Sequence, residues 1–232
     1  MIEKEEESRD VSIPPIGLPG TLDVPRNAHA LVIFAHGSGS SRLSPRNRSV
    51  ADALNRRGIV TLLFDLLTPT EEADRRNVFD IPLLADRLVD AVNWLDEEPV
   101  LARLPLGLFG ASTGAAAALV AAAKLPHRVR AVVSRGGRPD LAGDFLDRVR
   151  APTLLIVGGA DVGVIELNEQ ALARLGAGSA LEIVPYASHL FPEPGALEAV
   201  IGRAVRWFQR CLKPDPALSA SAAHWGLGDG RP

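Results

Sequence analysis

The chain has 232 residues, of which 47% are hydrophobic, and a formal net charge of −3 at pH 7. This hydrophobic share argues against a disordered protein, and the small net charge favours neither nucleic acid nor an anionic membrane surface as a partner. Cys211 is the only cysteine, so a disulfide within the chain is excluded and nothing indicates an oxidising compartment.

The first residues, "MIEKEEESRD", are acidic and lack the apolar core of a signal peptide. No apolar run reaches the roughly 18 residues that a membrane-spanning helix requires. We therefore expect a cytoplasmic protein with no membrane partner. Its expected parts are an acidic N-terminal segment (1–10), one domain (11–212) and a flexible C-terminal tail (213–232) rich in Pro, Gly, Ala and Ser.

The segment "VSIPPIGLPGTLDVP" (11–25) carries Gly-Pro turn signals and predicts an antiparallel hairpin at the edge of a sheet. From residue 30 onward, short apolar runs alternate with longer amphipathic segments. Strands are predicted at 30–37, 59–67, 104–110, 129–134, 153–159 and 181–186. Helices are predicted at 44–58, 80–98, after residue 112 to about 124, near 164–175 and at 195–212.

Alternation of strands and helices implies right-handed crossovers. The predicted fold class is therefore α/β, with a mostly parallel twisted sheet of about seven to eight strands and helices on both faces. Only one helix fits between the strands at 129–134 and 153–159. We therefore expect no cap domain, and an open cleft suited to small or medium-sized substrates.

Gly110-Ala111-Ser112-Thr113-Gly114 lies between a predicted strand and a predicted helix. In this context Gly-x-Ser-x-Gly is typical of a nucleophile elbow, in which the serine occupies a strained turn and its neighbours must be small. The alanines that follow let the helix lie close to the sheet. Ser112 is thus the candidate nucleophile.

A serine nucleophile needs a base, and the base needs an acid to orient it. Of the histidines after Ser112, His127 precedes a strand at the opposite edge of the sheet and His224 lies in the tail. His189 follows the last predicted strand at its carboxyl end, where the elbow also lies. We therefore assign His189 as the base.

The strongest candidate for the acid is Asp161, which ends the strand at 153–159 after a pair of glycines. Glu166, one turn into a helix, and Asp140, after a different strand, are weaker candidates. A turn or cap role is the alternative for Asp161.

Acyl transfer also needs two N–H donors for the developing oxyanion. One is expected from Thr113, directly after the nucleophile. The loop "HGSGSS" (36–41) should supply the other, with the N–H of Ser38 favoured and that of Gly39 as the alternative. His36 is expected to brace this loop and to take no part in the chemistry.

Two loops expected at the rim of this site are rich in arginine: "SRLSPRNR" carries Arg42, Arg46 and Arg48, and "SRGGRPDL" carries Arg135 and Arg138. A guanidinium there would suit a substrate carboxylate or phosphate. Arg46 and Arg138, with Gly39, are therefore candidate substrate-binding residues. The alternative is that the arginines pair with local acids such as Asp65 and Asp140.

The residues "FAHGSGSS", "FGASTG", "IVGGAD" and "ASHLF" resemble those of the α/β-hydrolase superfamily, and within it the dienelactone-hydrolase-like branch, from about residue 30 to 212. "SPRNR", "DLLT" and "SRGGRPDL" are similar to a bacterial subgroup of small hydrolases, some fused to phosphoribosyltransferase-like domains. The resemblance implies Ser112, Asp161 and His189 as nucleophile, acid and base. Dienelactone hydrolases proper have cysteine as the nucleophile, so Ser112 favours a serine carboxylesterase here.

Together these patterns predict an enzyme that cleaves carboxylic esters of small to medium size through an acyl-enzyme. Its expected partner is a small-molecule ester, its expected state a monomer or homodimer, and no metal or organic cofactor is implied. A thioesterase or acyltransferase with the same triad, and a binding module without turnover, are the alternative functions.

Overall fold

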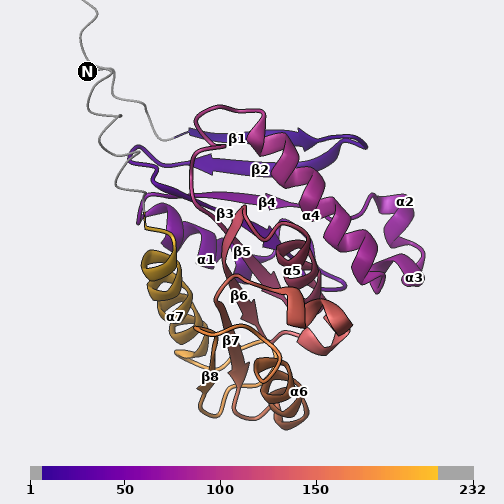
Figure 1. The fold of residues 1–232 in the computed structure, drawn as a ribbon, viewed down its shortest axis with the longest axis vertical. Helices are drawn as coiled ribbons and strands as arrows, with labels where there is room; N and C mark the ends of the chain where they lie inside the picture. The colour runs from indigo at the N-terminus through magenta and orange to yellow at the C-terminus, as the bar shows by residue number, and fades with distance from the viewer. Residues whose placement is uncertain (1–6, 214–232) are drawn as a thin grey trace, which may run out of the picture.

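An eight-stranded sheet runs through the centre of the molecule, in the order β1-β2-β4-β3-β5-β6-β7-β8. The computed structural model describes residues 7–213 of the chain (Figure 1). Strand β2 pairs antiparallel with both β1 and β4, and every other neighbouring pair is parallel. The predicted mostly parallel α/β sheet is therefore confirmed.

The strands are β1 (Glu7–Ile13), β2 (Leu18–Val24), β3 (Ala30–Ala35), β4 (Ile59–Phe64), β5 (Leu106–Ala111), β6 (Val129–Arg135), β7 (Thr153–Gly158) and β8 (Ala180–Val184). The α-helices are α1 (Pro45–Asn55), α2 (Pro69–Glu72), α3 (Arg75–Val78), α4 (Ile81–Asp96), α5 (Thr113–Lys124), α6 (Val162–Leu172) and α7 (Ala196–Cys211). A 3₁₀ segment, η1 (Pro139–Arg148), joins β6 to β7.

The N-terminal hairpin is longer than the sequence indicated. Strand β1 begins at Glu7, which pairs with Val24, so the acidic segment expected at 1–10 contributes its last four residues to the sheet. An edge strand accepts such charged residues because one of its sides faces solvent. The expected tail, apart from Lys213, lies outside the described residues.

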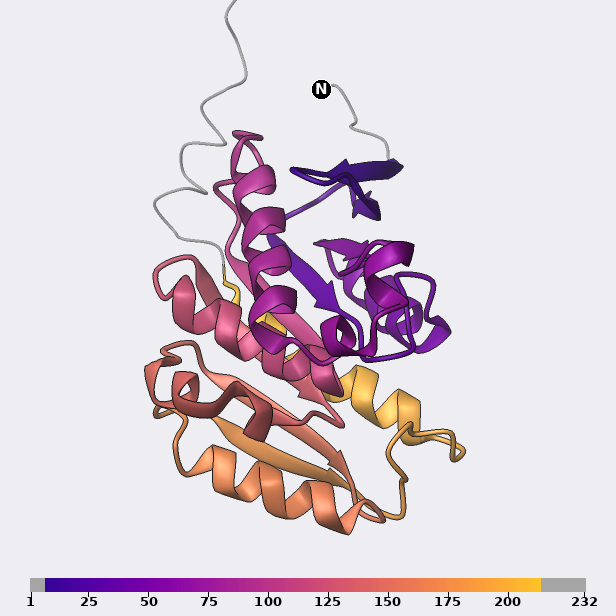
Figure 2. The same cartoon turned by 90° about the vertical axis from the view of Figure 1, so that its right-hand side faces the viewer.

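Helices cover both faces of the sheet, as Figure 2 shows. Helices α4 and α5 and residues of η1 and α6 form one hydrophobic cluster with one face. Helices α1 and α7 form a second cluster with the other face. Within residues 7–213, none of the helices combines the length and the apolar character that crossing a membrane demands.

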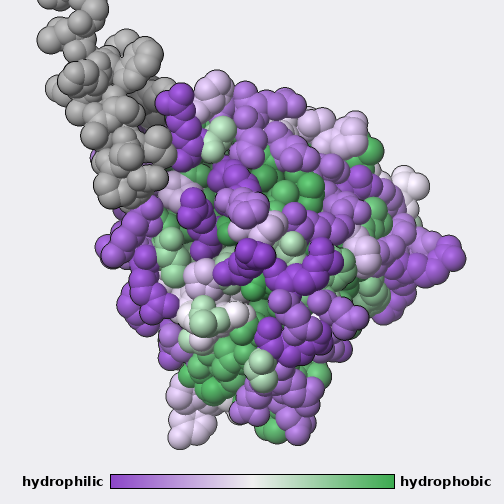
Figure 3. Space-filling view, in the orientation of Figure 1, coloured by the Kyte–Doolittle hydropathy of each residue, from purple (hydrophilic) through white to green (hydrophobic). Residues whose placement is uncertain are grey.

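Helix α5 is buried from Thr113 to Ala123 although it belongs to an outer layer. It packs between α4 and η1, and both flank it on the same face of the sheet. Figure 3, which views this layer, shows hydrophilic residues over most of the surface. Alanine suits α5 because a small side chain lets a helix surrounded on all sides approach its neighbours closely.

The segment between β4 and α4 holds two short helices that periodicity did not predict. Thr68 caps α2 in a capping box with Glu71, in which each side chain accepts from the backbone of the other. Between β6 and β7 only η1 is present, with a kink at Gly143 where φ is 53°. The sequence predicted no inserted cap between these two strands, and the structure has none there.

The close approach of α5 to β3 gives a test of this packing. A Cβ on Gly114 would overlap the carbonyl oxygens of Ala35 and His36, which are backbone atoms that cannot rotate away. We expect Gly114→Ala to destabilise the protein by about 1–3 kcal/mol or more, measured by urea unfolding. Gly163→Ala is the matched control, since a Cβ on this helical glycine would meet open space, and it should stabilise by about 0.5–1 kcal/mol. Equal effects of the two changes would contradict the packing.

Candidate active site

The backbone of Ser112 has the geometry of a strained turn. Its φ is 51° and its ψ is −121°, in a region that residues with side chains rarely adopt. The flanking glycines make the turn feasible, since a Cβ on Gly110 would overlap the backbone of Ala115. Ser112 lies between the end of β5 and the start of α5, at the carboxyl edge of the parallel strands, where open α/β sheets bind ligands.

His189 and Asp161 are joined by a hydrogen bond of 2.7 Å between Nδ1 and Oδ2. Asp161 directly precedes α6, and His189 lies in the loop after β8, so two neighbouring strands deliver the pair. The Asp161 side chain is 20% exposed and the His189 side chain is 38% exposed. A carboxylate on Nδ1 fixes the ring orientation and leaves Nε2 as the nitrogen available to a reacting group.

Ser112 and the His189 loop meet at the end of β6. The N–H of Ser112 donates to the carbonyl of Arg135 at 3.2 Å. The next residue, Gly136, lies against the loop, because a Cβ there would come within 2.9 Å of the carbonyl oxygen of His189. Among residues 7–213 the hydrogen bonds do not include one from the Ser112 hydroxyl to His189. Such contacts often tighten only when substrate binds.

The loop carrying His189 is held by residues that the sequence did not single out. Glu193 accepts the N–H of Ser188 through Oε1 at 3.0 Å, and this bond lowers the pKa of Glu193. Tyr186 and Phe191 both have positive φ, at 61° and 56°. Asn168 fixes the neighbouring loop, since its Nδ2 donates to the carbonyl of Gly137 at 3.0 Å. No motif marks Glu193 or Asn168, because each bonds a backbone group: Ser188 in the same loop and Gly137 in the loop after β6.

The N–H groups of Thr113 and Ser38, the two expected oxyanion donors, differ in the groups that they bind in this structure. Thr113 is the first residue of α5, so its N–H has no partner within the helix. The N–H of Ser38 donates to the hydroxyl of Thr113 at 3.0 Å. Ser38 can therefore serve an oxyanion only after the Thr113 side chain rotates or shares the bond. Gly39, the alternative donor, has a φ of 66° and stands in open space.

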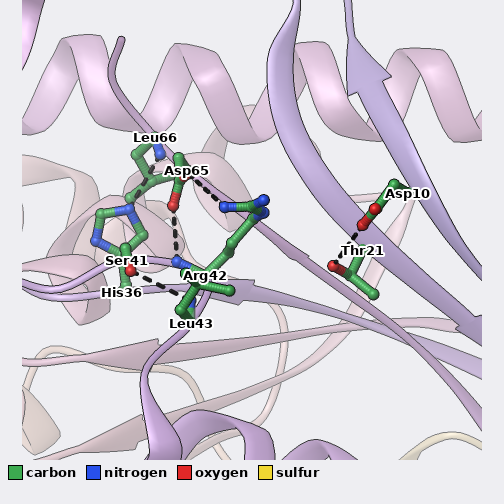
Figure 4. A network of polar contacts seen from close by, with 8 residues as sticks. All are labelled: Asp10, Thr21, His36, Ser41, Arg42, Leu43, Asp65 and Leu66. Carbon is green, nitrogen blue, oxygen red and sulfur yellow. Dashed lines mark hydrogen bonds and ion pairs between the residues drawn. The ribbon is translucent and has the colours of Figure 1, made fainter. Parts of the chain in front are cut away.

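A network of polar contacts braces the oxyanion loop, as Figure 4 shows. The Nε2 atom of His36 accepts the N–H of Leu66 at 3.0 Å, so Nδ1 carries the proton and donates to the carbonyl of Gly37 at 3.1 Å. Arg42 binds Asp65 through its backbone N–H at 2.7 Å and its guanidinium at 3.3 Å. Burial lowers the pKa of His36 and keeps the ring neutral. His36 thus has the bracing geometry expected from the sequence.

The arginines fall into two groups. Arg42 pairs with Asp65, and Arg138 makes two hydrogen bonds to Asp140 at 2.8 and 2.7 Å, as the alternative interpretation predicted. The bonds to Asp140 raise the pKa of Arg138. Arg138, proposed from the sequence as a substrate ligand, therefore already has a local carboxylate.

Arg135 and Arg46 form the second group. Arg135, expected at an open rim, is only 6% exposed, and its Nη2 donates to Oδ1 of Asn47 at 3.2 Å. Burial, and then the positive charge of Arg46, lower the pKa of Arg135 to about 10. Within residues 7–213 neither arginine forms an ion pair with a carboxylate. The structure thus separates paired arginines from unpaired ones.

A cavity of about 120 Å³ adjoins the candidate oxyanion donors. Its lining includes Ser38 and Thr113, the leucines Leu66, Leu67 and Leu84, and the carboxylates of Asp65 and Glu72. Pockets for drug-sized ligands are usually several hundred Å³. The cavity therefore has room only for a small group attached to a carbonyl at the candidate oxyanion donors.

A family model described as "Alpha/beta hydrolase domain" matches residues 28–196. The chain belongs to the α/β-hydrolase family. Among solved structures, a dienelactone hydrolase from Anabaena variabilis is 54% identical and superposes with a TM-score of 0.86, covering 91% of this chain and 100% of that one. Est1E from Butyrivibrio proteoclasticus is 16% identical with a TM-score of 0.74, over 88% of this chain and 98% of its own, and shows the shared fold.

Mycobacterium tuberculosis proteins from two strains, each named "Putative phosphoribosyl transferase", are 59% identical to this chain over 203 residues. The match covers 88% of this chain and 46% of theirs. This α/β hydrolase therefore spans about half the length of the curated relatives it matches.

The lowered pKa of His36 lets us predict how the stability of this hydrolase depends on pH. Since its pKa is lowered by burial, the unfolded chain takes up a proton below about pH 6.5 that the folded protein resists. Stability should therefore fall as the pH falls from 7 through this window toward about 5. Urea unfolding of the wild type and His36→Gln across this range isolates the effect, because the other histidines are common to both. Parallel pH profiles for the two proteins would refute it.

Proposed function

We propose that this α/β hydrolase is a serine esterase that cleaves carboxylic esters of small to medium size through an acyl-enzyme. Ser112 is the nucleophile, His189 the base and Asp161 the orienting acid. The observation that carries the proposal is the 2.7 Å bond between Asp161 and His189, placed at the same sheet edge as the strained Ser112.

The reaction begins when Nε2 of His189 takes the hydroxyl proton of Ser112 and Oγ attacks the ester carbonyl. Asp161 stabilises the imidazolium that forms. The carbonyl oxygen becomes an oxyanion, which accepts from the N–H of Thr113 and from that of Ser38 once the Thr113 hydroxyl has released it. Collapse expels the alcohol, which takes the proton from His189.

Water then enters at the same place. His189 removes a proton from it, the hydroxide attacks the acyl-enzyme carbonyl, and a second oxyanion forms in the same site. Collapse releases the carboxylic acid and returns the proton to Ser112. The cavity beside Ser38 and Thr113 supports a small group next to the carbonyl. The similarity to a dienelactone hydrolase at 54% identity also supports an ester as the substrate class.

Replacement of the nucleophile tests the mechanism. For Ser112→Ala we expect kcat/KM for p-nitrophenyl acetate and butyrate to fall by about 10⁴ or more, since no acyl-enzyme can form. The wild type should release a burst of p-nitrophenol equal to the enzyme concentration. Ser49→Ala is the control, because its hydroxyl donates to the carbonyl of Pro45 within α1. Activity retained in Ser112→Ala would remove this serine from the mechanism.

Replacement of the acid tests the role of the Asp161–His189 bond. Asp161→Asn keeps a polar partner on Nδ1 but can donate where the carboxylate accepts, so it favours the wrong histidine tautomer. We expect kcat to fall by about 10³–10⁴ with a smaller change in KM. Glu166→Gln, the weaker acid candidate one turn into α6, should change kcat by less than about threefold. The reverse ranking would move the acid to Glu166.

A further inference from the structure

Two arginines, one buried and one half-buried, lie beside the proposed catalytic residues and take no part in the chemistry described above. Arg135 is 6% exposed and Arg46 is half-buried. The Nε atom of each is buried without a hydrogen-bond partner among the described residues. Within residues 7–213, the one side-chain partner of Arg135 is the neutral amide of Asn47, itself 2% exposed. Buried charges in proteins are normally paired.

Four carboxylates at this edge of the sheet do not supply the missing partner, because each has a partner of its own. The pairs at this edge of the sheet are Asp65 with Arg42, Asp140 with Arg138, Asp161 with His189, and Glu193 with the N–H of Ser188. The first turn of α1 adds no acid either, and it carries Arg46 and Arg48 instead. Cations at a helix N-terminus are unfavourable unless an anion joins them.

The position of Arg135 ties this pair to the proposed site. It is the last residue of β6 and its carbonyl accepts the N–H of Ser112. From there the side chain reaches Asn47 in the first turn of α1, so it passes across the end of β5, the strand between β6 and β3. Gly136, the next residue, contacts the His189 loop. The guanidinium therefore lies between the elbow, the His189 loop and the start of α1.

Arg135 and the leucine wall of the cavity belong to opposite faces of the sheet. Ala131 and Val133 of β6 pack with α1 and α7, and Arg135 follows them at the same two-residue spacing. The leucines of the cavity belong to the cluster under α4 and α5, and its other lining residues include two carboxylates and no arginine. A carbonyl bound at the oxyanion donors would thus have its two substituents directed to different surroundings, of which only one is cationic.

We propose that Arg46 and Arg135 bind an anionic group of the substrate, a carboxylate or a phosphate, so that the enzyme prefers esters that carry such a group. This proposal rests on the proposed esterase function. Guanidinium groups match both anions because their N–H donors form pairs of parallel hydrogen bonds with two oxygens. The anion supplies the partner that each Nε lacks and compensates two adjacent positive charges.

A kinetic experiment compares matched esters. p-Nitrophenyl hydrogen adipate is paired with its neutral methyl ester, a phosphonate-bearing p-nitrophenyl ester with its dimethyl ester, and 4-acetoxybenzoate with methyl 4-acetoxybenzoate. The first two pairs place the anion on the acyl side and the third on the alcohol side. In at least one pair, kcat/KM of the wild type should be higher for the anionic ester than for the neutral one. Arg46→Gln and Arg135→Gln should lower kcat/KM for it by about tenfold to a hundredfold relative to its neutral partner.

Arg48→Gln is the matched control, because Arg48 is an exposed arginine two residues after Arg46 on the same helix. It should leave the preference within about twofold of the wild type, as expected for an exposed charge that is screened by salt. Arg46→Gln, at a half-buried position, also keeps the test valid if the buried Arg135→Gln does not fold. An equal loss on charged and neutral esters would overturn the proposal.

A binding measurement separates this proposal from the esterase function, because it needs no turnover. Inorganic phosphate or adipate should raise the Tm of wild type and of Ser112→Ala by several degrees above sodium chloride of equal ionic strength. The anion that gives the larger rise at equal concentration identifies a phosphate or a carboxylate as the preferred group. The rise should vanish in Arg46→Gln and persist in Arg48→Gln. A rise that is absent from the wild type, or unchanged in Arg46→Gln, would refute the anion site even if the esters are hydrolysed.

Discussion

The contact between the start of α5 and the end of β3 sets the geometry of the whole candidate site. Gly114 lies so close to the carbonyl oxygens of Ala35 and His36 that no side chain fits between them. Because the helix cannot move away from the strand, Thr113 comes within hydrogen-bond distance of Ser38. The same approach brings Gly37 against the Cβ of Ser112 and the backbone of Ala111. One backbone contact therefore fixes the candidate nucleophile and the candidate oxyanion loop relative to each other, and the strain at Ser112 is held by packing on both sides.

Parallel topology explains why much of this site could be predicted from the sequence. The apolar runs identify strands, and every parallel strand delivers the residue after it to the same edge, so Ser112, Asp161 and His189 could be placed together without knowledge of distances. The partners of individual side chains were harder to predict from the sequence. Glu193 bonds a backbone group of its own loop and Asn168 one of the loop after β6, and no local pattern reports such contacts. The start of β1 at Glu7 was also missed, because charged residues on an edge strand look like a solvated segment.

Arg135 shows most clearly where sequence reasoning stops. Its place at the end of a strand was predicted, but not whether its side chain would point to solvent or fold under a loop. The side-chain alternation of β6 directs it toward α1, where it reaches Asn47. Arg138, three residues later in the same motif, binds Asp140 instead. Identical residue types in one short motif thus meet opposite electrostatic environments, and only the three-dimensional positions of their neighbours distinguish them.

The energetic consequence concerns the ligand-free enzyme. A buried guanidinium next to a second positive charge has lost hydration without gaining a counter-ion, and the lowered pKa of Arg135 reflects that burial and the nearby charge of Arg46. Such a cost persists in a folded protein when the surrounding structure enforces it, and it is commonest at functional sites. An anionic substrate would recover the cost on binding, whereas a neutral ester would not. The preference for the anionic ester over the neutral one would then have two sources. One is the new hydrogen bonds, and the other is removal of the unfavourable energy of the uncompensated arginines in the empty site.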